Sequence, residues 1–332
     1  MHIALVDPSR VVVKCVTRML NARQHEVRGF ADGPEALDYV NCRPDVDALI
    51  TSAELVTMSG MELCWKARMA ADSRRPLYII LMSSITDHRK IGEALDSGAD
   101  EFIGKPPVPE ELYARLRMAE RVGTMQRQLI QLATTDPLTG LLNRRAFFGR
   151  AEEAVQRPHP ARAISIVMFD VDHFKRVNDM HGHDVGDEVL RQVSREAAHD
   201  DAVIGRLGGE EFAILLDGWP GPDAAAFAER LRMRIAALMF EAASGRLSVT
   251  CSFGVAERIA GEPIDLVLKR ADVALYAAKQ GGRNRIVAAD ADAADTMPRS
   301  ADSIVRARVR VPMEPAAPIM PVANAAFKFL KA

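Results

Sequence analysis

Short apolar runs separated by helical patterns fill the N-terminal third of the chain. Four of these runs are apolar at nearly every position and do not alternate with polar residues: 2–6, 48–51, 77–82 and 102–103. Residues 11–21 and 88–97 have the spacing of helices. Strands that are buried on both faces and separated by helices are typical of a parallel sheet covered on both sides. The pattern therefore predicts an α/β doubly wound parallel sheet over residues 1–115, with ligands gathering at the carboxyl ends of its strands.

A long helical pattern follows this region. Three prolines between residues 106 and 109 precede it, and residues 110–133 continue it without a further proline. Its apolar positions are spaced alternately by four and three residues: Met118, Val122, Met125, Leu129 and Leu132. This spacing is typical of paired helices, although a helix packed on its own domain shows it too. We expect a stalk of about 35 Å that pairs in parallel with a second copy of the chain.

A different alternation of turns, helices and strands begins at residue 134. Residues 136–140 carry turn signals, and a helix is expected over residues 143–154. An apolar strand over residues 164–169 ends at an acidic residue, and one helix-like stretch follows over residues 173–197. Two apolar segments then flank Gly208-Gly209, a pair typical of a two-residue hairpin turn. Glycines in such a turn also let the backbone approach a ligand closely.

Acidic side chains gather where these apolar strands end. Asp170 ends one strand, and Glu210 and Glu211 follow the glycine pair. A carboxylate beside buried strands is costly unless it is hydrated or bound to a metal. Lys279 and Arg283 lie downstream and supply positive charge. Oxygen ligands for Mg²⁺ and cations for phosphate are what phosphoryl or nucleotidyl transfer needs, whereas the glycine pair and two glutamates alone would also suit an ordinary acidic hairpin.

The second half of the chain closely resembles the GGDEF family of diguanylate cyclases, which condense two GTP into cyclic di-GMP and release pyrophosphate. Five segments carry the resemblance, in the order of the family: DPLTGLLNRR, DVDHFKRVNDMHGHDVGDEVL, RLGGEEF, SFGVA and ADVALYAAKQGGRNR. The resemblance implies an α+β domain over residues 134–290, with a sheet like that of nucleotide cyclases and polymerase palms.

The resemblance also implies which residues bind metal and catalyse the reaction. Asp170 should bind both of two Mg²⁺ ions, for which Mn²⁺ is an alternative, with the Val171 carbonyl assisting. Glu211 should be a further metal ligand. Glu210 should be a metal ligand and the base, or metal-assisted activator, for the attacking ribose 3′-hydroxyl. As neighbours on a strand the two glutamates would point to opposite sides, so we expect them to have different roles.

The substrate-binding residues follow from the same resemblance. The guanine pocket of the family corresponds to Asn178, His183 and Asp187, and an amide and a carboxylate suit the acceptor and donor edges of guanine. Gly208 and Gly209 should let the hairpin lie close to the phosphates. Positive charge for the triphosphate or the transition state should come from three residues, of which the first is also a catalytic candidate: Lys175, Lys279 and Arg283.

Other polar residues of this region have structural interpretations. Asp172 is expected to be solvated or to start a helix, and Asp136 is expected to form an ion pair with Arg145. His181 and His183 have a spacing that suits a metal pair poorly. Residues 199–202 read HDDA where many family members carry an RxxD product-inhibition site, so we expect weak or absent feedback by cyclic di-GMP through that site.

The first domain resembles a response-regulator receiver domain. Four features carry the resemblance, each in the family's order: Asp7 after the first strand, MSGMELC over residues 58–64, Ser83 after the fourth strand, and Lys105-Pro106 after the fifth. The alignment places Ser52 at the phospho-accepting aspartate and Pro8 at one of the metal-binding acids. A serine cannot form the labile acyl phosphate, and a lost carboxylate should weaken Mg²⁺ binding. We therefore expect a degenerate receiver fold that serves dimerisation or partner binding, with Glu54 as an alternative source of the missing charge.

Composition limits the partners and the cellular location expected for the protein. The 332 residues carry 43 basic and 45 acidic side chains, a net charge of -2 that argues against nucleic-acid binding. The four cysteines are widely spaced, as expected of reduced thiols rather than of disulfides or a zinc site. No signal-peptide core and no apolar run of the ~20 residues that span a bilayer is evident. We expect a cytoplasmic protein that does not bind membranes.

The combined expectation is a dimeric enzyme that makes a second messenger from GTP. The alternative is a catalytically silent, GTP-sensing scaffold that acts through partners. An unidentified regulatory protein could bind the receiver-like domain or the Ala-, Pro- and Arg-rich residues 291–332. For that tail we expect a flexible linker, with strand-like alternation over 304–311 and a short helix over 324–330, or plain disorder.

Overall fold

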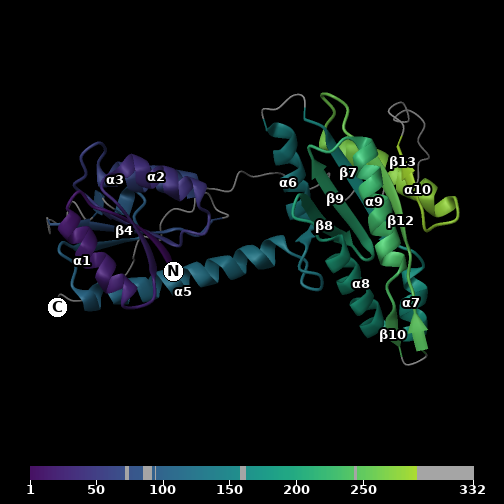
Figure 1. Ribbon diagram of the computed structural model, residues 1–332, viewed down its shortest axis with the longest axis horizontal. Helices are drawn as coiled ribbons and strands as arrows, with labels where there is room; N and C mark the ends of the chain where they lie inside the picture. Colours follow the sequence, from purple (N-terminus) through teal and green to yellow (C-terminus); the bar gives the residue numbers. More distant parts are fainter. Residues whose placement is uncertain (72–74, 85–91, 94, 158–161, 243–244, 290–332) are drawn as a thin grey trace, which may run out of the picture. The chain divides into compact units, whose positions relative to one another are not determined.

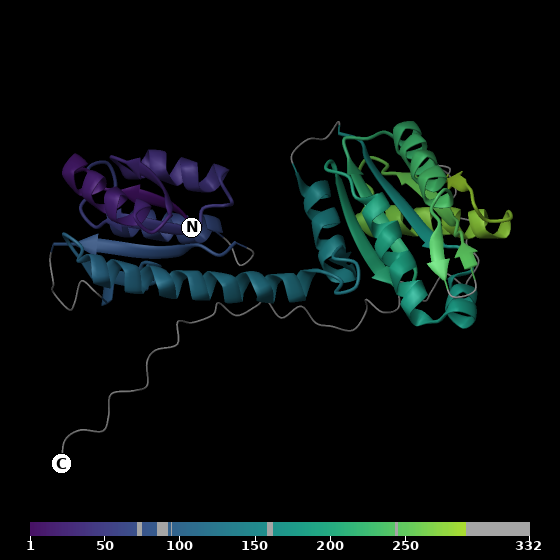
Figure 2. The ribbon, with the colours of Figure 1, turned by 60° about the horizontal axis from the view of Figure 1, so that its bottom comes forward.

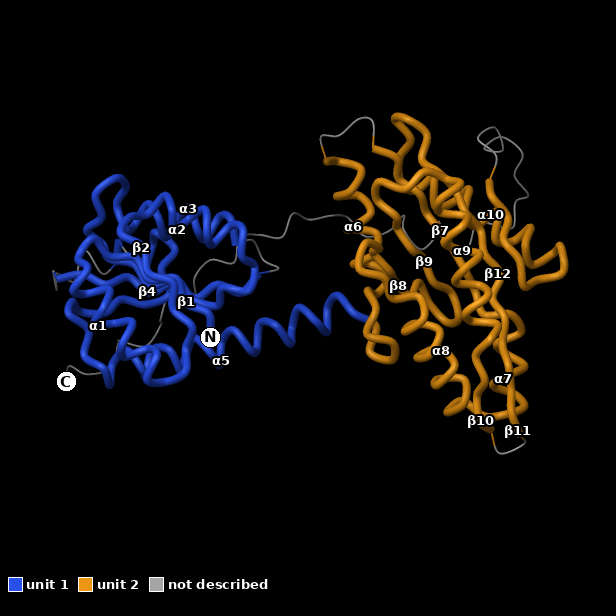
Figure 3. Tube along the Cα trace, viewed as in Figure 1, with its two compact units in different colours: residues 1–135 blue, residues 136–332 orange. Residues whose placement is uncertain are grey.

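The computed structural model describes residues 1–71, 75–84, 92–93, 95–157, 162–242 and 245–289. The chain divides into two compact units, residues 1–135 and 136–332, coloured separately in Figure 3. The predicted tail over residues 291–332 lies outside the described residues, as do residues 88–91 and 94 of the helix predicted over residues 88–97. No helix among the described residues combines the length and the hydrophobicity needed to cross a membrane.

Unit 1 contains a five-stranded parallel sheet, which confirms the predicted doubly wound fold. The strand order is β2-β1-β3-β4-β5, and the strands are β1 His2–Val6, β2 Glu26–Phe30, β3 Ala48–Ser52, β4 Tyr78–Ser83 and β5 Glu101–Gly104. Four of the five coincide with the apolar runs. The sequence analysis did not include β2, because its residues EVRGF are mostly solvent-exposed at the sheet edge and contain no apolar run.

Helices cover both faces of this sheet. One hydrophobic cluster joins the sheet to α2 Gly33–Cys42 and α3 Gly60–Ala71, through residues such as Val40 and Leu63. A second cluster on the other face joins it to α1 Arg10–Asn21 and α5 Pro109–Thr134, through residues such as Leu20 and Leu116. Figure 1 shows these helices around the strands. The carboxyl ends of β1, β3, β4 and β5 remain free to carry polar side chains.

Helix α5 is the predicted stalk, and its two halves differ. Leu112, Leu116 and Ala119 are buried against the sheet. Further along, Met125, Leu129 and Leu132 are 60%, 63% and 76% exposed. Figure 2 shows the first half of α5 along the rest of unit 1 and the second half beyond it. The packing of a helix on its own domain is therefore confirmed for the first half of α5, whereas pairing of the exposed half with a second copy stays a prediction.

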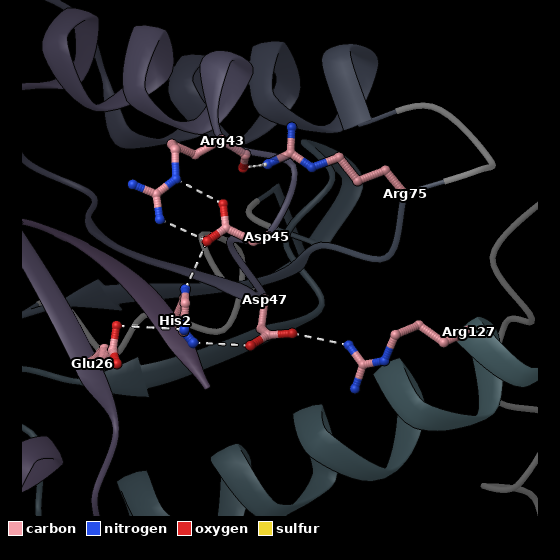
Figure 4. A network of polar contacts seen from close by, with 7 residues as sticks. All are labelled: His2, Glu26, Arg43, Asp45, Asp47, Arg75 and Arg127. Atoms are coloured by element: carbon pink, nitrogen blue, oxygen red, sulfur yellow. Dashed lines mark hydrogen bonds and ion pairs between the residues drawn. The ribbon is translucent and has the colours of Figure 1, made fainter. Parts of the chain in front are cut away.

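A polar network ties α5 to the amino-terminal edge of unit 1 (Figure 4). Arg127 of α5 contacts Asp47, with 2.9 Å between Nη1 and Oδ1. The other Asp47 oxygen accepts the backbone N–H of His2 at 2.9 Å, and the His2 ring contacts Asp45 and Glu26. The network fixes the helix against the loop that precedes β3.

Unit 2 is the predicted α+β domain, built on a six-stranded sheet. The strand order is β13-β12-β7-β9-β8-β6, with β7 antiparallel to β9 and β12, β8 antiparallel to β9, and the two edge strands parallel to their neighbours. The strands are β6 Leu142–Asn143, β7 Ile164–Val171, β8 Ala202–Gly208, β9 Glu211–Asp217, β12 Cys251–Glu257 and β13 Ile286–Ala288. A separate hairpin is formed by β10 Phe240–Ala242 and β11 Gly245–Leu247.

Two layers of helices cover this sheet. One layer contains α7 Phe174–His181, α8 His183–Ala197 and α9 Gly221–Ala236. The other contains α6 Arg144–Gln156 and α10 Ile264–Gln280. Helix α10 lies so close to β12 that a Cβ on Gly254 would be 2.0 Å from the Ala271 carbonyl oxygen. Glycine in the SFGVA segment is therefore what lets α10 approach the strand.

Two local predictions in unit 2 are wrong in detail. The stretch over residues 173–197 is two helices, because Gly182 adopts φ 85° and ψ 162° and ends the first of them. The hairpin turn is one residue later than predicted: Gly208 pairs with Glu211, so the turn residues are Gly209 and Glu210. A register irregularity between Arg206 and Gly208 accounts for the shift.

Candidate functional site

Three strand ends bring the predicted acidic residues together. Asp170 is opposite Glu211 of β9 on one side and opposite Ser252 of β12 on the other. Glu210 lies in the turn next to them, and its carbonyl accepts the backbone N–H of Val171 at 3.3 Å. Because Glu210 is a turn residue, strand alternation does not set its direction as the sequence analysis assumed. The antiparallel pairing of β7 with the hairpin thus builds the site.

The glycine turn leaves this site open. Gly208 has φ 152° and Gly209 has φ 52°, and no atom lies within 4 Å of the Cβ position of either residue. The Gly209 carbonyl accepts from Arg206 Nε at 2.9 Å, and Arg206 Nη1 also lies 3.0 Å from Asp136 Oδ1. The predicted Asp136–Arg145 ion pair is therefore wrong, since the partner of Asp136 is an arginine of the hairpin. Arg206 thus links the turn of the hairpin to Asp136 at the start of the domain.

Carboxylates outnumber cations around Asp170. Burial raises the pKa of Asp170 to about 6, against the opposing effect of Lys279, and the charges of Glu210 and Glu211 raise it further. The Lys279 ammonium lies 2.8 Å from Asp170 Oδ2. Burial likewise raises the pKa of Asp272, and the charge of Glu211 adds to the effect. Four carboxylates share one nearby ammonium group, an excess of negative charge that a divalent cation would neutralise.

Asp272 was missed by the sequence analysis. It lies on α10 seven residues before Lys279, which is two helical turns and therefore the same face. An acidic residue within the otherwise apolar stretch of ADVALY was the available signal.

The donor set at these strand ends fits a hard divalent cation. Asp170, Glu210, Glu211 and the Val171 carbonyl offer oxygen atoms only, the ligand type that Mg²⁺ prefers. Within the described ranges, no three His, Cys, Asp or Glu side chains are grouped so as to hold a metal ion as they stand. The two glutamates would have to rotate about their side-chain bonds to join Asp170, and their positions, Glu210 in the turn and Glu211 at the start of β9, allow this.

The predicted guanine-binding residues lie around the α7–α8 break. Asn178 of α7 packs over Gly186 of α8, where a Cβ would be 1.9 Å from the Asn178 side-chain oxygen. Asp187 follows Gly186 and is half exposed, and its only charged neighbour among the described residues is Arg191 at 3.9 Å. His183 is exposed in the first turn of α8. Asn178 and Asp187 thus lie at one helix junction, while no described contact joins His183 to them.

Lys175 and Arg283 are both exposed. Neither side chain forms an ion pair within the part of the chain that the structure describes. Lys175 is on α7, and Arg283 is in the turn after α10 with φ 61°.

Asp172 is buried, whereas it was expected to be solvated or to start a helix. It is 5% exposed, and the residue before α7 is His173, so Asp172 is neither solvated nor a helix cap. Its carboxylate accepts from Ser252 Oγ at 2.6 Å, Thr250 Oγ1 at 2.7 Å and the Asn284 backbone N–H at 3.0 Å.

The polar residues predicted in unit 1 converge at the strand ends. Lys105 Nζ lies 2.7 Å from Asp7 Oδ2 and donates to Ser52 Oγ at 3.0 Å. The Glu54 carboxylate accepts from Ser83 Oγ at 2.8 Å and from Ser52 Oγ at 3.3 Å. The Glu54 carboxylate therefore adds a negative charge to this cluster, next to Ser52 and Ser83.

Two family models match parts of the chain. Residues 133–285 match "Diguanylate cyclase, GGDEF domain", and residues 3–117 match "Response regulator receiver domain". The response regulator PleD of Caulobacter vibrioides is 35% identical over 257 residues, which are 73% of this chain and 56% of PleD. Diguanylate cyclase DgcM of Escherichia coli is 41% identical over 169 residues, which are 50% of this chain and 40% of DgcM. The chain thus spans about half the length of the curated relatives that it matches.

A solved structure of the coiled coil and GGDEF domain of DgcB from Caulobacter crescentus, in complex with c-di-GMP, is similar to part of this chain. It shares 37% sequence identity and has a TM-score of 0.49, over 54% of this chain and 99% of that one.

Proposed function

Because the chain combines a GGDEF domain of the diguanylate cyclase family with an N-terminal receiver domain, we propose that it condenses two GTP into cyclic di-GMP and two pyrophosphate. The observation that carries the proposal is the pairing of Asp170 with Glu211 next to an open glycine turn, with Lys279 at 2.8 Å from Asp170. These groups supply oxygen ligands and positive charge at one place, as nucleotidyl transfer requires.

Divalent metal use is general in this family, and the acidic cluster is where this chain would hold the ions. Asp170, Glu210, Glu211 and the Val171 carbonyl would bind two Mg²⁺, or Mn²⁺ in their place. When bound, such ions neutralise charge on the phosphates and on the attacking and leaving oxygens. Asp170, with its pKa of about 6, is largely ionised at neutral pH and available for this role.

The remaining residues bind and orient the nucleotide. Asn178 and Asp187, with His183 beside them, would recognise guanine at the helix junction. Lys175, Lys279 and Arg283 would neutralise the triphosphate. Glu210 would take the proton of the ribose 3′-hydroxyl. The 3′-oxygen then bonds to the α-phosphorus of the other GTP, and pyrophosphate leaves. Gly208 and Gly209, at the end of the hairpin, carry no side chains and so give the phosphates room to approach the backbone.

A single domain offers one such site, so the cyclic product requires two domains facing each other. The exposed Met125, Leu129 and Leu132 of α5 would pair with the same residues of a second copy. A paired stalk raises the effective concentration of one half-site near the other. Because the receiver cluster is already satisfied by Glu54, activity would be constitutive or set by a regulatory protein, a ligand or expression level.

Incubation of the purified chain with GTP and Mg²⁺ tests the proposal, with nucleotides separated by chromatography. Wild type should form cyclic di-GMP, and excess EDTA should stop the reaction. Glu210→Ala should lose the activity, whereas Glu241→Ala, at an exposed glutamate of β10, should retain it. GTP binding without product in the wild type would instead support a silent GTP-sensing scaffold.

A further inference from the structure

The buried carboxylate of Asp172 has no part in the proposed chemistry, yet it has three hydrogen-bond donors. Two are the hydroxyls of Thr250 and Ser252, which come from β12 and the residue before it. The third is the backbone N–H of Asn284, from the turn that follows α10. One carboxylate thus connects the end of β7, the start of β12 and the turn that carries Arg283.

That turn has an unfavourable backbone. Gly282, Arg283 and Asn284 have φ values of 112°, 61° and 44°. Two consecutive non-glycine residues in the left-handed region are sterically disfavoured and persist only where surrounding contacts hold them. Since residues 281–285 are exposed, burial does not supply that constraint.

Hydrogen bonds from several elements hold the backbone of this turn in its left-handed conformation. The Arg283 N–H donates to the Ala278 carbonyl at 3.1 Å, and the Phe253 N–H donates to the Arg285 carbonyl at 2.9 Å. Arg232 Nη1 of α9 donates to the Asn284 side-chain oxygen at 2.6 Å, and Glu229 holds Arg232 through two contacts. The Asp172 bond is the tether that comes from the strand bearing Asp170.

Arg283 depends on this turn for its direction. Its guanidinium has no ion-pair partner within the described residues, so the backbone of the turn, which sets the direction of the Cα–Cβ bond, determines which region the side chain can reach. Lys279 lies one turn earlier on α10 and already reaches Asp170. A tether that starts two residues after Asp170 and ends one residue after Arg283 links the acidic cluster to the second cation.

We propose that Asp172 is a positioning residue for Arg283: by accepting the Asn284 N–H it holds the left-handed turn that presents the guanidinium to the triphosphate of bound GTP. The inference rests on the proposed function for the identity of the ligand. It concerns the phosphate end of the nucleotide and not the metal ions.

Asp172→Asn tests the inference, because the amide has the size of the carboxylate but only one acceptor oxygen for three donors. The KM for GTP should rise about tenfold, equivalent to about 1.4 kcal/mol, with a smaller change in kcat. Arg283→Ala should raise KM at least as much, and the double variant should be no worse than Arg283→Ala alone. Ser252→Ala, which leaves the Asn284 tether in place, should change KM less than threefold.

Two measurements do not depend on turnover. Calorimetry with the unreactive analogue α,β-methylene-GTP should show the same loss of affinity in Asp172→Asn. Hydrogen–deuterium exchange of the peptide spanning residues 281–286 should be faster in Asp172→Asn than in wild type, without nucleotide. If Asp172→Asn does not fold, Asp172→Ser, which leaves room for water, takes its place in both measurements.

The outcomes separate this inference from the proposed function. A wild type that neither binds the analogue nor forms product would defeat the proposed function, and the exchange measurement would still test the tether. A variant that only lowers Tm, with KM, analogue affinity and exchange of residues 281–286 unchanged, would overturn the inference. Additive effects of Asp172→Asn and Arg283→Ala on KM would overturn it as well.

Discussion

The carboxylate of Asp170 and the ammonium group of Lys279 lie 2.8 Å apart at the end of β7, yet the pKa of Asp170 is raised to about 6. Burial next to Glu210 and Glu211 therefore outweighs one adjacent cation. Carboxylates exceed cations at this site, and their mutual repulsion lowers the stability of the free protein. A positively charged ligand would relieve that repulsion.

Asp170→Asn should change how stability depends on pH. The pKa of Asp170 is higher in the folded chain than its ordinary 3.8, so between about pH 4 and pH 6 the folded state binds more protons than the unfolded state. In EDTA, the wild type should lose up to about 3 kcal/mol of unfolding free energy relative to Asp170→Asn as the pH rises from 4 to 7.

Urea unfolding at a series of pH values measures this difference. Asp200→Asn, at an exposed loop position, is the matched control and should follow the wild type. Parallel curves for wild type and Asp170→Asn would show that the raised pKa does not exist in the free protein.

The receiver domain should not respond to a phosphodonor. Ser52 is expected from the sequence at the acceptor position, and Glu54 already accepts from Ser52 and Ser83. Intact-mass measurement after incubation with acetyl phosphate and Mg²⁺ should show no added phosphoryl group. A phosphoaspartate located in residues 3–117 by peptide mass spectrometry would contradict this interpretation.

Charges on the exposed half of α5 should prevent the proposed pairing of two chains. Leu129→Lys with Leu132→Lys places two cations on the apolar face, where each buried leucine would contribute about 1.5–3 kcal/mol. Light scattering should show monomers, and the rate of cyclic di-GMP formation at low protein concentration should fall at least tenfold. Gln128→Lys, at an exposed polar position of the same helix, is the control. An intact dimer in the double variant would place the interface elsewhere.

Product feedback through the RxxD position should be weak. His199, which is expected from the sequence to replace the arginine, packs edge-on against Trp219 and Phe227 with ring centroids 5.9 and 5.4 Å away. An imidazole held by two aromatic rings offers little to a phosphate. Initial rates of GTP turnover should stay constant as the concentration of added cyclic di-GMP is raised through the micromolar range. Noncompetitive inhibition that disappears in His199→Ala would refute the expectation.

Periodicity predicted the parallel sheet of unit 1, and the resemblance to the GGDEF family implied the α+β fold of unit 2. Strand patterns predicted the strand ends that carry Asp170 and Glu211. They were not enough for contacts between distant segments. Asp136 pairs with Arg206, 70 residues away, and not with the nearer Arg145, because the hairpin returns to the start of the domain. The turn position also escaped prediction, because the irregularity near Gly208 depends on how β8 pairs with β9.

Asp172 illustrates the same limit. An acidic residue after a strand is ordinarily solvated, and only the tertiary fold brings Thr250, Ser252 and Asn284 to it. Asp272 was hidden for a related reason, because its charge matters only where α10 lies over β7 and β12.

The stoichiometry of the reaction tests the central claim most directly. GTP consumed, cyclic di-GMP formed and pyrophosphate released are measured together over time with the purified chain and Mg²⁺. Two GTP should disappear for each cyclic di-GMP and two pyrophosphate that form, and Asp170→Asn should form none. GTP that is bound but unchanged, or is hydrolysed to GDP and phosphate, would contradict it.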